Sequence, residues 1–374
     1  PALHPHLRAC LVLSRTHQGA RQCINLRPTD VLKSLQEVHP TCMSSVPRFW
    51  EKVYQAVMEK MEKGSFLERK LISEALEVGG RYWTQYKAKG KPAPMGLTLQ
   101  YQLYDKTIIK TLRKTLGLER ANIFPTAGAA VSPEVERFVH AAGLNMVVGY
   151  GLTESLATVS CDRKNMPFTI GSVGRPLDEV EVKIGPNSEI LLKGPTITPG
   201  YYHRDSINAE AFDADGFFRT GDAGYMKDGE LYLKERIKDL FKTSNGKYIA
   251  PQMVESMMLV DKYIDQVAVV ADQRKFVSAL IVPEFRLVEK WADDHGVKYD
   301  SRESLCNNPE VKKMIMERLE TLQQGLASYE QVKRITLLPH HFSMESGELT
   351  NTLKIKRGVI YKNYKDIIDK MYED

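Results

Sequence analysis

Residues 148–155 read Val-Gly-Tyr-Gly-Leu-Thr-Glu-Ser, and they continue a short apolar run, Asn145-Met-Val-Val148, that predicts a β-strand. The glycines on either side of Tyr150 let the backbone pass close to a flat or charged ligand. Thr153 and Glu154 then set a hydroxyl beside a carboxylate, a combination suited to holding a phosphate together with Mg²⁺. On its own, the stretch is more typical of a tight turn after a buried strand.

Length and composition limit the classes of protein to which the chain can belong. Its 374 residues suffice for two or three domains, and 43% hydrophobic with 26% charged residues is typical of a soluble globular protein. The net charge of +5 is mild and does not suggest nucleic-acid binding, but it suits anionic ligands such as nucleotides, or light contact with a membrane surface. Five scattered cysteines and the lack of a long apolar run predict reduced thiols in a cytoplasmic protein without a transmembrane helix.

The sequence pattern changes three times along the chain. The predicted segments are residues 1–22, 23–165, 166–237 and 238–374. The first has no clear period and is expected to form an irregular leader. The second places strand, helix and strand in order over residues 123–148, which predicts a parallel sheet. The third alternates around Asp228-Gly229 and predicts an antiparallel sheet or small barrel, whereas the fourth mixes helices and strands as a small α+β domain.

Five stretches of the chain together resemble the acyl-adenylate-forming enzymes, and most closely the long-chain fatty acyl-CoA synthetases. These stretches are GYGLTES at 149–155, EILLKGP at 189–195, DADGFFRTGDAGY at 213–225, KERIKDLFKTSNGKYIAP at 234–251 and GELTNTLKIKR at 347–357. Their order, over about residues 24–374, argues against a chance match. The helical stretch over residues 50–116 favours the long-chain subgroup over other adenylating enzymes.

The resemblance implies both a fold and a reaction. The fold is the remainder of a large adenylating domain, with a parallel α/β part and a small β-barrel, followed by a small mobile α+β domain. The implied reaction is a two-step ligation in which a fatty acid carboxylate attacks the α-phosphate of ATP, giving acyl-AMP and pyrophosphate. The thiol of coenzyme A then attacks the acyl carbon and releases AMP, and Mg²⁺ is the implied metal ion.

The resemblance also implies a nucleotide site. Its residues are Gly128, Ala129, Ala130, Gly149, Tyr150, Gly151, Leu152, Thr153, Asp222, Arg236 and Lys247. In this site Asp222 would accept hydrogen bonds from both ribose hydroxyls, and Glu154 would bind Mg²⁺. Each residue also has an ordinary structural interpretation, such as a turn aspartate for Asp222, a surface ion pair for Arg236 and a solvated loop carboxylate for Glu154.

The remaining implied roles concern catalysis and domain movement. Lys354 aligns with the family's catalytic lysine, with Lys356 as the rival assignment, and Thr153 and Glu154 complete the catalytic set. A fixed ammonium at Lys354 would stabilise the charge that builds on the carboxylate and α-phosphate oxygens. The hinge is implied at Lys238 and Asp239, and the coenzyme A path at Ser244, Asn245 and Gly246.

One departure from the family leaves alternatives open. The Ser/Thr/Gly-rich phosphate loop that the family carries upstream has no counterpart in this sequence. The chain is therefore expected to lack the N-terminal part of a full-length synthetase. One alternative is the same fold acting on another carboxylate, such as an aryl acid. The other is a truncated, catalytically silent homologue that binds only nucleotide or a partner.

Overall fold

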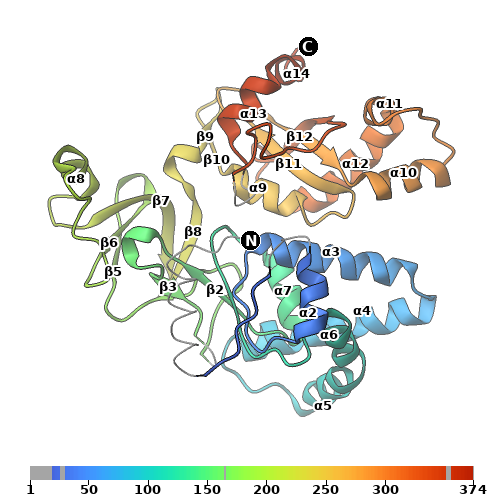
Figure 1. Ribbon diagram of the computed structural model, residues 1–374, viewed down its shortest axis with the longest axis horizontal. Helices are drawn as coiled ribbons and strands as arrows, with labels where there is room; N and C mark the ends of the chain where they lie inside the picture. Colours follow the sequence, from blue (N-terminus) through green and yellow to red (C-terminus); the bar gives the residue numbers. More distant parts are fainter. Residues whose placement is uncertain (1–18, 26–29, 164–165, 351–354, 374) are drawn as a thin grey trace. The chain divides into compact units, whose positions relative to one another are not determined.

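The protein is described here by a computed structural model, and it divides into two compact units, Pro1–Ile237 and Lys238–Asp374 (Figure 1). The described residues are 19–25, 30–163, 166–350 and 355–373. Most of the predicted leader, up to residue 18, therefore lies outside the described residues. Within the described ranges no helix is long and apolar enough to cross a membrane. The four cysteines in these ranges, Cys23, Cys42, Cys161 and Cys306, are free, as expected for reduced thiols.

A group of helices forms the first part of the first unit. They are α2 (Val31–Val38), α3 (Pro47–Lys63), α4 (Phe66–Gly80), α5 (Met95–Tyr104), α6 (Lys110–Leu116) and α7 (Pro133–Ala141). The helical stretch predicted over residues 50–116 comprises α3 to α6, in which α5 begins at Met95, directly after Pro94, and runs through a π-helical turn into α6. Of the apolar residues on the first turns of α5, Met95 and Leu99 are exposed and only Leu97 is buried. They therefore give no pattern of a buried helix face from which its start could be read.

A mixed sheet lies beside these helices and carries the first glycine-rich stretch. Its strands are β1 (Phe124–Thr126), β2 (Met146–Tyr150), β3 (Ser160–Cys161) and β4 (Arg175–Pro176), in that order. β1 and β2 are parallel, as the strand–helix–strand order predicted, and α7 connects them. Ser132 caps α7 by accepting a hydrogen bond from the amide of Glu134, and Pro133 occupies the first turn.

The second part of the first unit is a four-stranded antiparallel sheet. Its strands are β5 (Glu181–Ile184), β6 (Glu189–Lys193), β7 (Phe218–Lys227) and β8 (Glu230–Arg236), in that order, and the short helix α8 (Asp205–Ala211) lies between β6 and β7 in the chain. The predicted hairpin at Asp228-Gly229 is confirmed, because these two residues connect β7 to β8 with φ values of 52° and 78°. Positive φ at both central residues is the geometry that two-residue hairpin turns require.

The second unit contains a small sheet with helices around it. Its strands are β9 (Phe241–Lys242), β10 (Tyr248–Ile249), β11 (Ile264–Val270), β12 (Val277–Pro283) and β13 (Val332–Leu337). Its helices are α9 (Pro251–Met258), α10 (Phe285–Asp294), α11 (Arg302–Asn307), α12 (Pro309–Leu322), α13 (Arg357–Asn363) and α14 (Lys365–Lys370). Every residue of β12 is buried, because β12 lies between antiparallel β11 and parallel β13 in the centre of the core.

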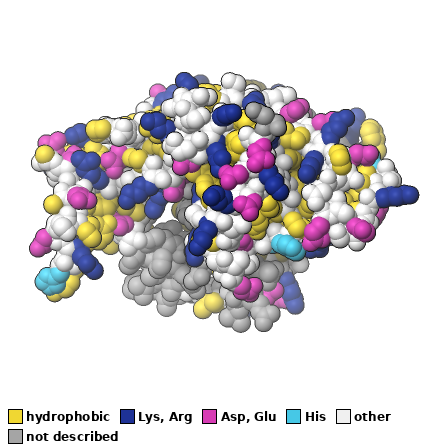
Figure 2. Space-filling model, turned by 90° about the horizontal axis from the view of Figure 1, so that it is seen from above, with side chains coloured by type: hydrophobic (Ala, Val, Ile, Leu, Met, Phe, Trp, Pro, Cys, Tyr) yellow, Lys and Arg dark blue, Asp and Glu magenta, His cyan; other side chains and the backbone are white. Residues whose placement is uncertain are grey.

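On the face shown in Figure 2, cationic and anionic side chains are interspersed rather than gathered by sign.

The first unit also buries carboxyl groups that the sequence pattern did not reveal. Glu136 on α7 accepts a hydrogen bond from the Gly171 amide at 2.9 Å, and Asp162 accepts one from the Val148 amide at 3.2 Å. Burial, together with the charges of Asp162 and Glu230, raises the pKa of Glu136 to about 8. Burial also raises the pKa of Asp162 to about 7. In the folded protein these groups therefore keep protons that the unfolded chain releases.

We predict that the first unit loses stability as the pH rises. The pKa of Glu136 is raised from 4.5 to about 8, so its contribution is complete below pH 4.5 and is lost as the pH rises through about 8. The Glu136→Gln variant keeps an acceptor for Gly171, and its free energy of unfolding should fall less between pH 5 and pH 8. Urea unfolding followed by tryptophan fluorescence in a Trp291→Phe background reports on this unit.

The matched control is Glu77→Gln, which changes an exposed carboxylate on α4. It should keep the pH dependence of the parent protein. Equal slopes for the Glu136→Gln variant and the parent would show that Glu136 is not the group that titrates.

Candidate functional site

The chain folds back on itself directly after β2, and this sets the position of Thr153 and Glu154. A Cβ atom at Gly151 would lie 1.8 Å from the carbonyl oxygen of Ala157, so only glycine fits there. Ser155 closes the turn, because its hydroxyl accepts from the Leu152 amide at 3.1 Å and donates to the Leu152 carbonyl at 3.0 Å. Thr153 is left exposed and Glu154 is half-buried.

Two residues at the end of this turn hold a strained backbone. Leu156 and Ala157 have φ values of 49° and 84°, in the left-handed region that residues with a Cβ rarely adopt. Each such residue costs on the order of 1–3 kcal/mol and persists only where its surroundings enforce it. Here the close approach of the backbone at Gly151 enforces the turn.

Glu154 is held by a second segment, the loop that follows β6. Its carboxylate accepts a hydrogen bond from the Tyr201 hydroxyl at 2.8 Å, and its main-chain oxygen accepts from the Thr198 amide at 2.7 Å. Burial and the Glu154 carboxylate raise the pKa of Tyr201 to about 12, so this phenol stays protonated and donates. A pocket of about 360 Å³ lies here, lined by Thr153, Glu154, Leu156, Pro195, Thr196, Ile197, Thr198, Pro199 and Tyr201.

The second predicted acidic residue, Asp222, lies on β7 and is buried. Its carboxylate accepts a hydrogen bond from the Tyr150 hydroxyl at 2.6 Å, and its other oxygen lies 3.3 Å from the Arg236 side chain. Burial and the neighbouring Asp222 charge raise the pKa of Tyr150, so its hydroxyl keeps the proton that it donates. The Arg236 side chain is 66% exposed, and its ion pair therefore adds little stability by itself.

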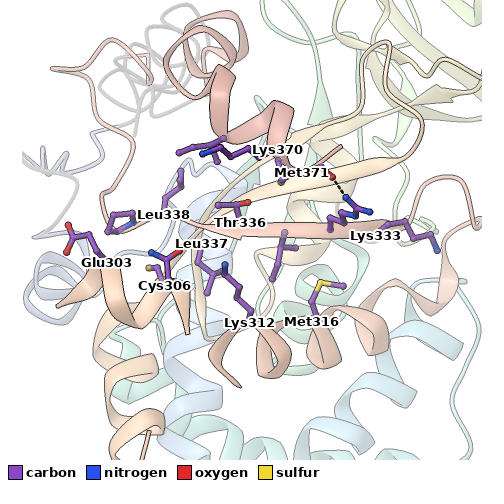
Figure 3. Close-up of a pocket in the computed structure, with 15 residues that line it drawn as sticks. Glu303, Cys306, Lys312, Met316, Lys333, Thr336, Leu337, Leu338, Lys370 and Met371 are labelled. Atoms are coloured by element: carbon purple, nitrogen blue, oxygen red, sulfur yellow. Dashed lines mark hydrogen bonds between the residues drawn. The ribbon is translucent and has the colours of Figure 1, made fainter. Parts of the chain in front are cut away.

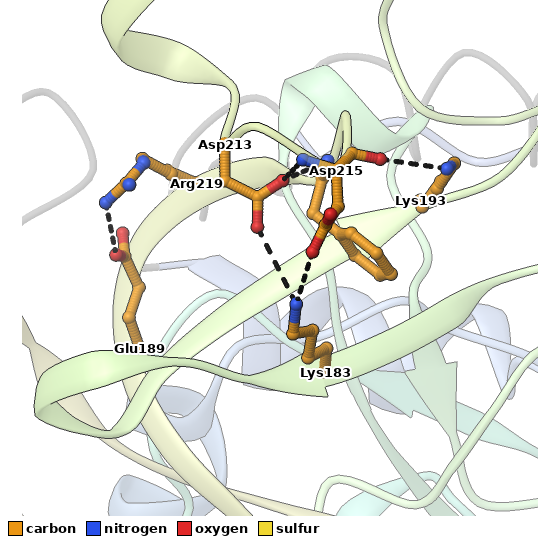
Figure 4. A network of polar contacts seen from close by, with 7 residues as sticks. Lys183, Glu189, Lys193, Asp213, Asp215 and Arg219 are labelled. Atoms are coloured by element: carbon orange, nitrogen blue, oxygen red, sulfur yellow. Dashed lines mark hydrogen bonds and ion pairs between the residues drawn. The ribbon is translucent and has the colours of Figure 1, made fainter.

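The turn that carries Asp222 is braced from the neighbouring strand β6. Glu189 accepts a hydrogen bond from the Gly221 amide at 3.0 Å and pairs with Arg219 at 3.6 Å. Figure 4 shows this pair together with Lys183, which lies 3.0 Å from Asp215 on the loop before β7. The contacts fix the backbone of the Arg-Thr-Gly-Asp stretch on both sides of Gly221.

Three small residues of the implied nucleotide site, Gly128, Ala129 and Ala130, follow the carboxyl end of β1. Because β1 and β2 are parallel, Gly128–Ala130 and Gly149–Leu152 leave the same edge of the sheet. Ligands of open α/β sheets bind at this edge. Gly128 has a φ of 99°, and a Cβ atom there would meet no atom within 4 Å.

The remaining predicted residues belong to the second unit or lie outside the described residues. Lys238 and Asp239 form a short turn where the second unit begins. Ser244, Asn245 and Gly246 form the exposed turn between β9 and β10, and Lys247 lies over the ring of Tyr329 at 5.6 Å from its centre. Lys354 lies outside the described residues.

The structure thus brings Tyr150 to Asp222 and Tyr201 to Glu154. Neither contact was predicted, and Tyr201 was not among the predicted site residues. Tyr201 lies in the Gly200-Tyr-Tyr202 segment, where two adjacent tyrosines gave no sign of which one points inward. Tyr202 is 88% exposed, whereas Tyr201 is half-buried. Among the described residues, no group of three or more His, Cys, Asp or Glu side chains is arranged to hold a metal ion.

Comparison with known proteins finds similar sequences among long-chain acyl-CoA synthetases. The chain is 32% identical over 386 residues to long-chain-fatty-acid–CoA ligase 1 of Schizosaccharomyces pombe, covering 98% of this chain and 56% of the relative. It is 28% identical over 369 residues to the peroxisomal long chain acyl-CoA synthetase 7 of Arabidopsis thaliana, covering 92% of this chain and 51% of the relative. The chain therefore spans about half the length of the relatives it matches.

Solved structures and family models agree with this relationship. The adenylation domain of a carboxylate reductase from Mycobacterium chelonae matches with a TM-score of 0.67 at 22% identity, covering 92% of this chain and 48% of that one. The predicted adenylating fold, with a large α/β domain followed by a smaller α+β domain, is confirmed by this likeness. Residues 4–202, more than half of the chain, match the model for the AMP-binding enzyme, and residues 238–374 match that for the AMP-binding enzyme C-terminal domain. The chain belongs to the AMP-binding enzyme family.

Proposed function

We propose that this chain is part of an AMP-forming ligase that joins a long-chain fatty acid to coenzyme A through an acyl-AMP intermediate. The observation that carries the proposal is the buried Asp222 carboxylate, which accepts a hydrogen bond from the Tyr150 hydroxyl. Tyr150 is the last residue of β2 and precedes Glu154 by four positions. Relatives named as long-chain acyl-CoA synthetases support the choice of acid, at 28–32% identity.

The nucleotide is held by main-chain groups and by Asp222. Gly128, Ala129 and Ala130, with the segment from Gly149 to Leu152, offer backbone without bulky side chains to the flat adenine ring. The two vicinal hydroxyls of ribose donate hydrogen bonds to the oxygens of Asp222. Arg236, which lies beside Asp222 and is largely exposed, makes a second contact with the ribose or a phosphate.

Thr153 and Glu154 hold the phosphate end of the nucleotide. The exposed Thr153 hydroxyl donates to an α-phosphate oxygen, and the Glu154 carboxylate faces the 360 Å³ pocket beside it. Mg²⁺ fits this position, because it binds one or two carboxylates together with substrate phosphate oxygens. When bound, the ion would neutralise phosphate charge as pyrophosphate leaves. Tyr201 keeps the Glu154 carboxylate oriented without cancelling its charge.

The second unit supplies the remaining groups of the proposed mechanism. The ammonium of Lys354 offsets the repulsion between the fatty acid carboxylate and the α-phosphate during adenylation. Lys238 and Asp239 act as the hinge on which this unit turns before the second step. Ser244, Asn245 and Gly246 line the path of coenzyme A, and Lys247 is available for its phosphates.

The direct test is ATP–pyrophosphate exchange, measured on the protein that carries these residues, with fatty acids of graded length and with benzoate. Exchange should be strongest with a long-chain acid and should depend on Mg²⁺. Exchange that is strongest with benzoate would assign the fold to another carboxylate. If no acid supports exchange while AMP still binds, the chain is a silent nucleotide-binding homologue.

We predict that Asp222→Ala weakens AMP binding without unfolding the protein. Loss of a charged acceptor for two ribose hydroxyls should cost about 2–3 kcal/mol of binding free energy, measured by calorimetry. Tyr150→Phe keeps the carboxylate and should cost less, and Glu181→Ala, an exposed carboxylate on β5, should change nothing. A folded Asp222→Ala protein with the AMP affinity of the parent would rule out the ribose contact.

We predict that Lys354→Ala nearly abolishes acyl-AMP formation and spares the attack of coenzyme A on supplied acyl-AMP. Loss of one preorganised donor to developing charge typically costs roughly 3–4 kcal/mol of transition-state stabilisation. Lys356→Ala is the matched control and should change little, since its side chain is exposed and two residues away.

Three outcomes separate the parts of this assignment. Loss of adenylation in Lys356→Ala instead would shift the catalytic position by two residues. Equal loss of both half-reactions in Lys354→Ala would contradict a second unit that turns between the steps, and with it the hinge at Lys238 and Asp239.

A further inference from the structure

A groove follows the outer edge of β13 in the second unit, away from every residue assigned above. We call it the edge groove, with a volume of about 570 Å³. It is lined by Glu303, Cys306, Asn307, Lys312, Met316, Lys333, Arg334, Ile335, Thr336, Leu337, Leu338, Pro339, Ile367, Lys370 and Met371. Figure 3 shows Lys312 and Met316 on one side of β13 and Lys370 with Met371 on the other. The groove therefore runs along the strand between helices that cover opposite faces of the sheet.

The main chain of β13 leaves hydrogen-bonding groups facing this groove. β13 pairs with β12 and, within the described part of the chain, with no other strand. Leu338 donates its amide to Ile281 of β12 at 2.8 Å, and Ile335 and Leu337 are the register partners of Ala279 and Ile281. In a parallel pair with this register, the amide and carbonyl groups of Ile335 and Leu337 point away from β12. Such groups are the template onto which another strand adds.

At the start of this edge, the side chain of Gln323 makes the main-chain hydrogen bonds that an added strand would make. The side-chain amide of Gln323, which is buried, donates to the Val332 carbonyl at 3.2 Å and accepts from the Val332 amide at 2.9 Å. A side-chain amide offers the same donor and acceptor as a peptide bond. Gln323 thus closes the edge at Val332 and leaves open the part that begins at Lys333, about 17 Å long.

The charges around the edge groove select the chemistry of a ligand. Lys312, Lys333 and Lys370 line it, and no carboxylate in the described ranges forms an ion pair with any of them. Glu303, the one carboxylate in the lining, lies 3.5 Å from His340. Arg334 is already held, since it donates to the carbonyls of Met371 and Glu373. Within the described residues the groove therefore offers three ammonium groups without an ion pair around an apolar floor, and one of them, Lys333, donates a hydrogen bond to the Gln331 side chain at 3.2 Å.

We propose that the edge groove binds an extended acidic peptide segment of a partner protein, which adds to the sheet as a fourth strand beside β13. Main-chain hydrogen bonds to Ile335 and Leu337 give affinity, as in other cases of strand addition. Apolar side chains at alternate positions of the peptide lie on one face of the sheet, where they fill the floor that Met316 and Leu337 line. Acidic side chains reach the lysines at the rim, and the attraction weakens as salt rises.

The experiment uses the whole protein and a fluorescent hexapeptide of alternating Glu and Val, with binding followed by anisotropy at low salt. The peptide should bind at least roughly tenfold more tightly than its Lys–Val counterpart, because the rim is cationic. N-methylation of one alternate set of peptide amides should abolish binding, whereas methylation of the other set should not. This difference reports directly on strand pairing, since only every second amide of an added strand faces β13.

Protein variants test whether the lysines that line the edge groove attract the peptide. Lys333→Glu combined with Lys370→Glu should weaken binding roughly tenfold or more, as reversal of two attractive charges predicts. Lys362→Glu combined with Lys365→Glu changes two exposed lysines outside the groove and should leave binding unchanged. Equal effects of the two N-methylated peptides, equal effects of the two protein variants, or no binding of the acidic peptide would each overturn the proposal.

Discussion

The buried hydrogen bond from the Tyr150 hydroxyl to Asp222 is the interaction on which the proposed site depends. It joins two residues 72 positions apart, one on β2 of the mixed sheet and one on β7 of the antiparallel sheet. A buried donor or acceptor that loses its partner costs about 1–3 kcal/mol, and more when it is charged. The two sheets of the first unit therefore cannot shift against each other at this point without leaving a carboxylate unsatisfied.

This bond is possible only because the backbone around it can approach closely. Gly151 packs against the carbonyl of Ala157, and a Cβ atom at Gly224 on β7 would lie 2.4 Å from the carbonyl of Tyr232. Neither contact leaves room for a side chain, so each glycine is required by packing on neighbouring backbone rather than by an unusual φ. The strained pair Leu156 and Ala157 is the local cost of the sharp turn that follows.

Much of this fold could be predicted from periodicity and turn residues, and much of the site could not. The parallel β1–β2 pair and the Asp228-Gly229 hairpin followed from local sequence, because each is formed by consecutive elements of the chain. The pairing of Tyr201 with Glu154 depends on how the loop after β6 crosses the end of β2, which no local pattern encodes. The same holds for Glu136, whose place on the amphipathic α7 gave no sign that it is buried.

The two phenol–carboxylate pairs also show how a site for an anionic ligand can orient its carboxylates with neutral donors. A lysine or arginine in place of Tyr201 would fix Glu154 equally well, but it would cancel the negative charge that a metal ion requires. A neutral hydroxyl donates one hydrogen bond, fixes the orientation of the carboxylate and leaves its second oxygen free to bind. Within the described residues no cation forms an ion pair with Glu154, whereas the ion pair of Asp222 is with the largely exposed Arg236. The raised pKa values of both tyrosines follow from the same arrangement, because a phenol that is partly buried beside a carboxylate holds its proton. The two tyrosine hydroxyls therefore orient Asp222 and Glu154 without adding a positive charge at either carboxylate.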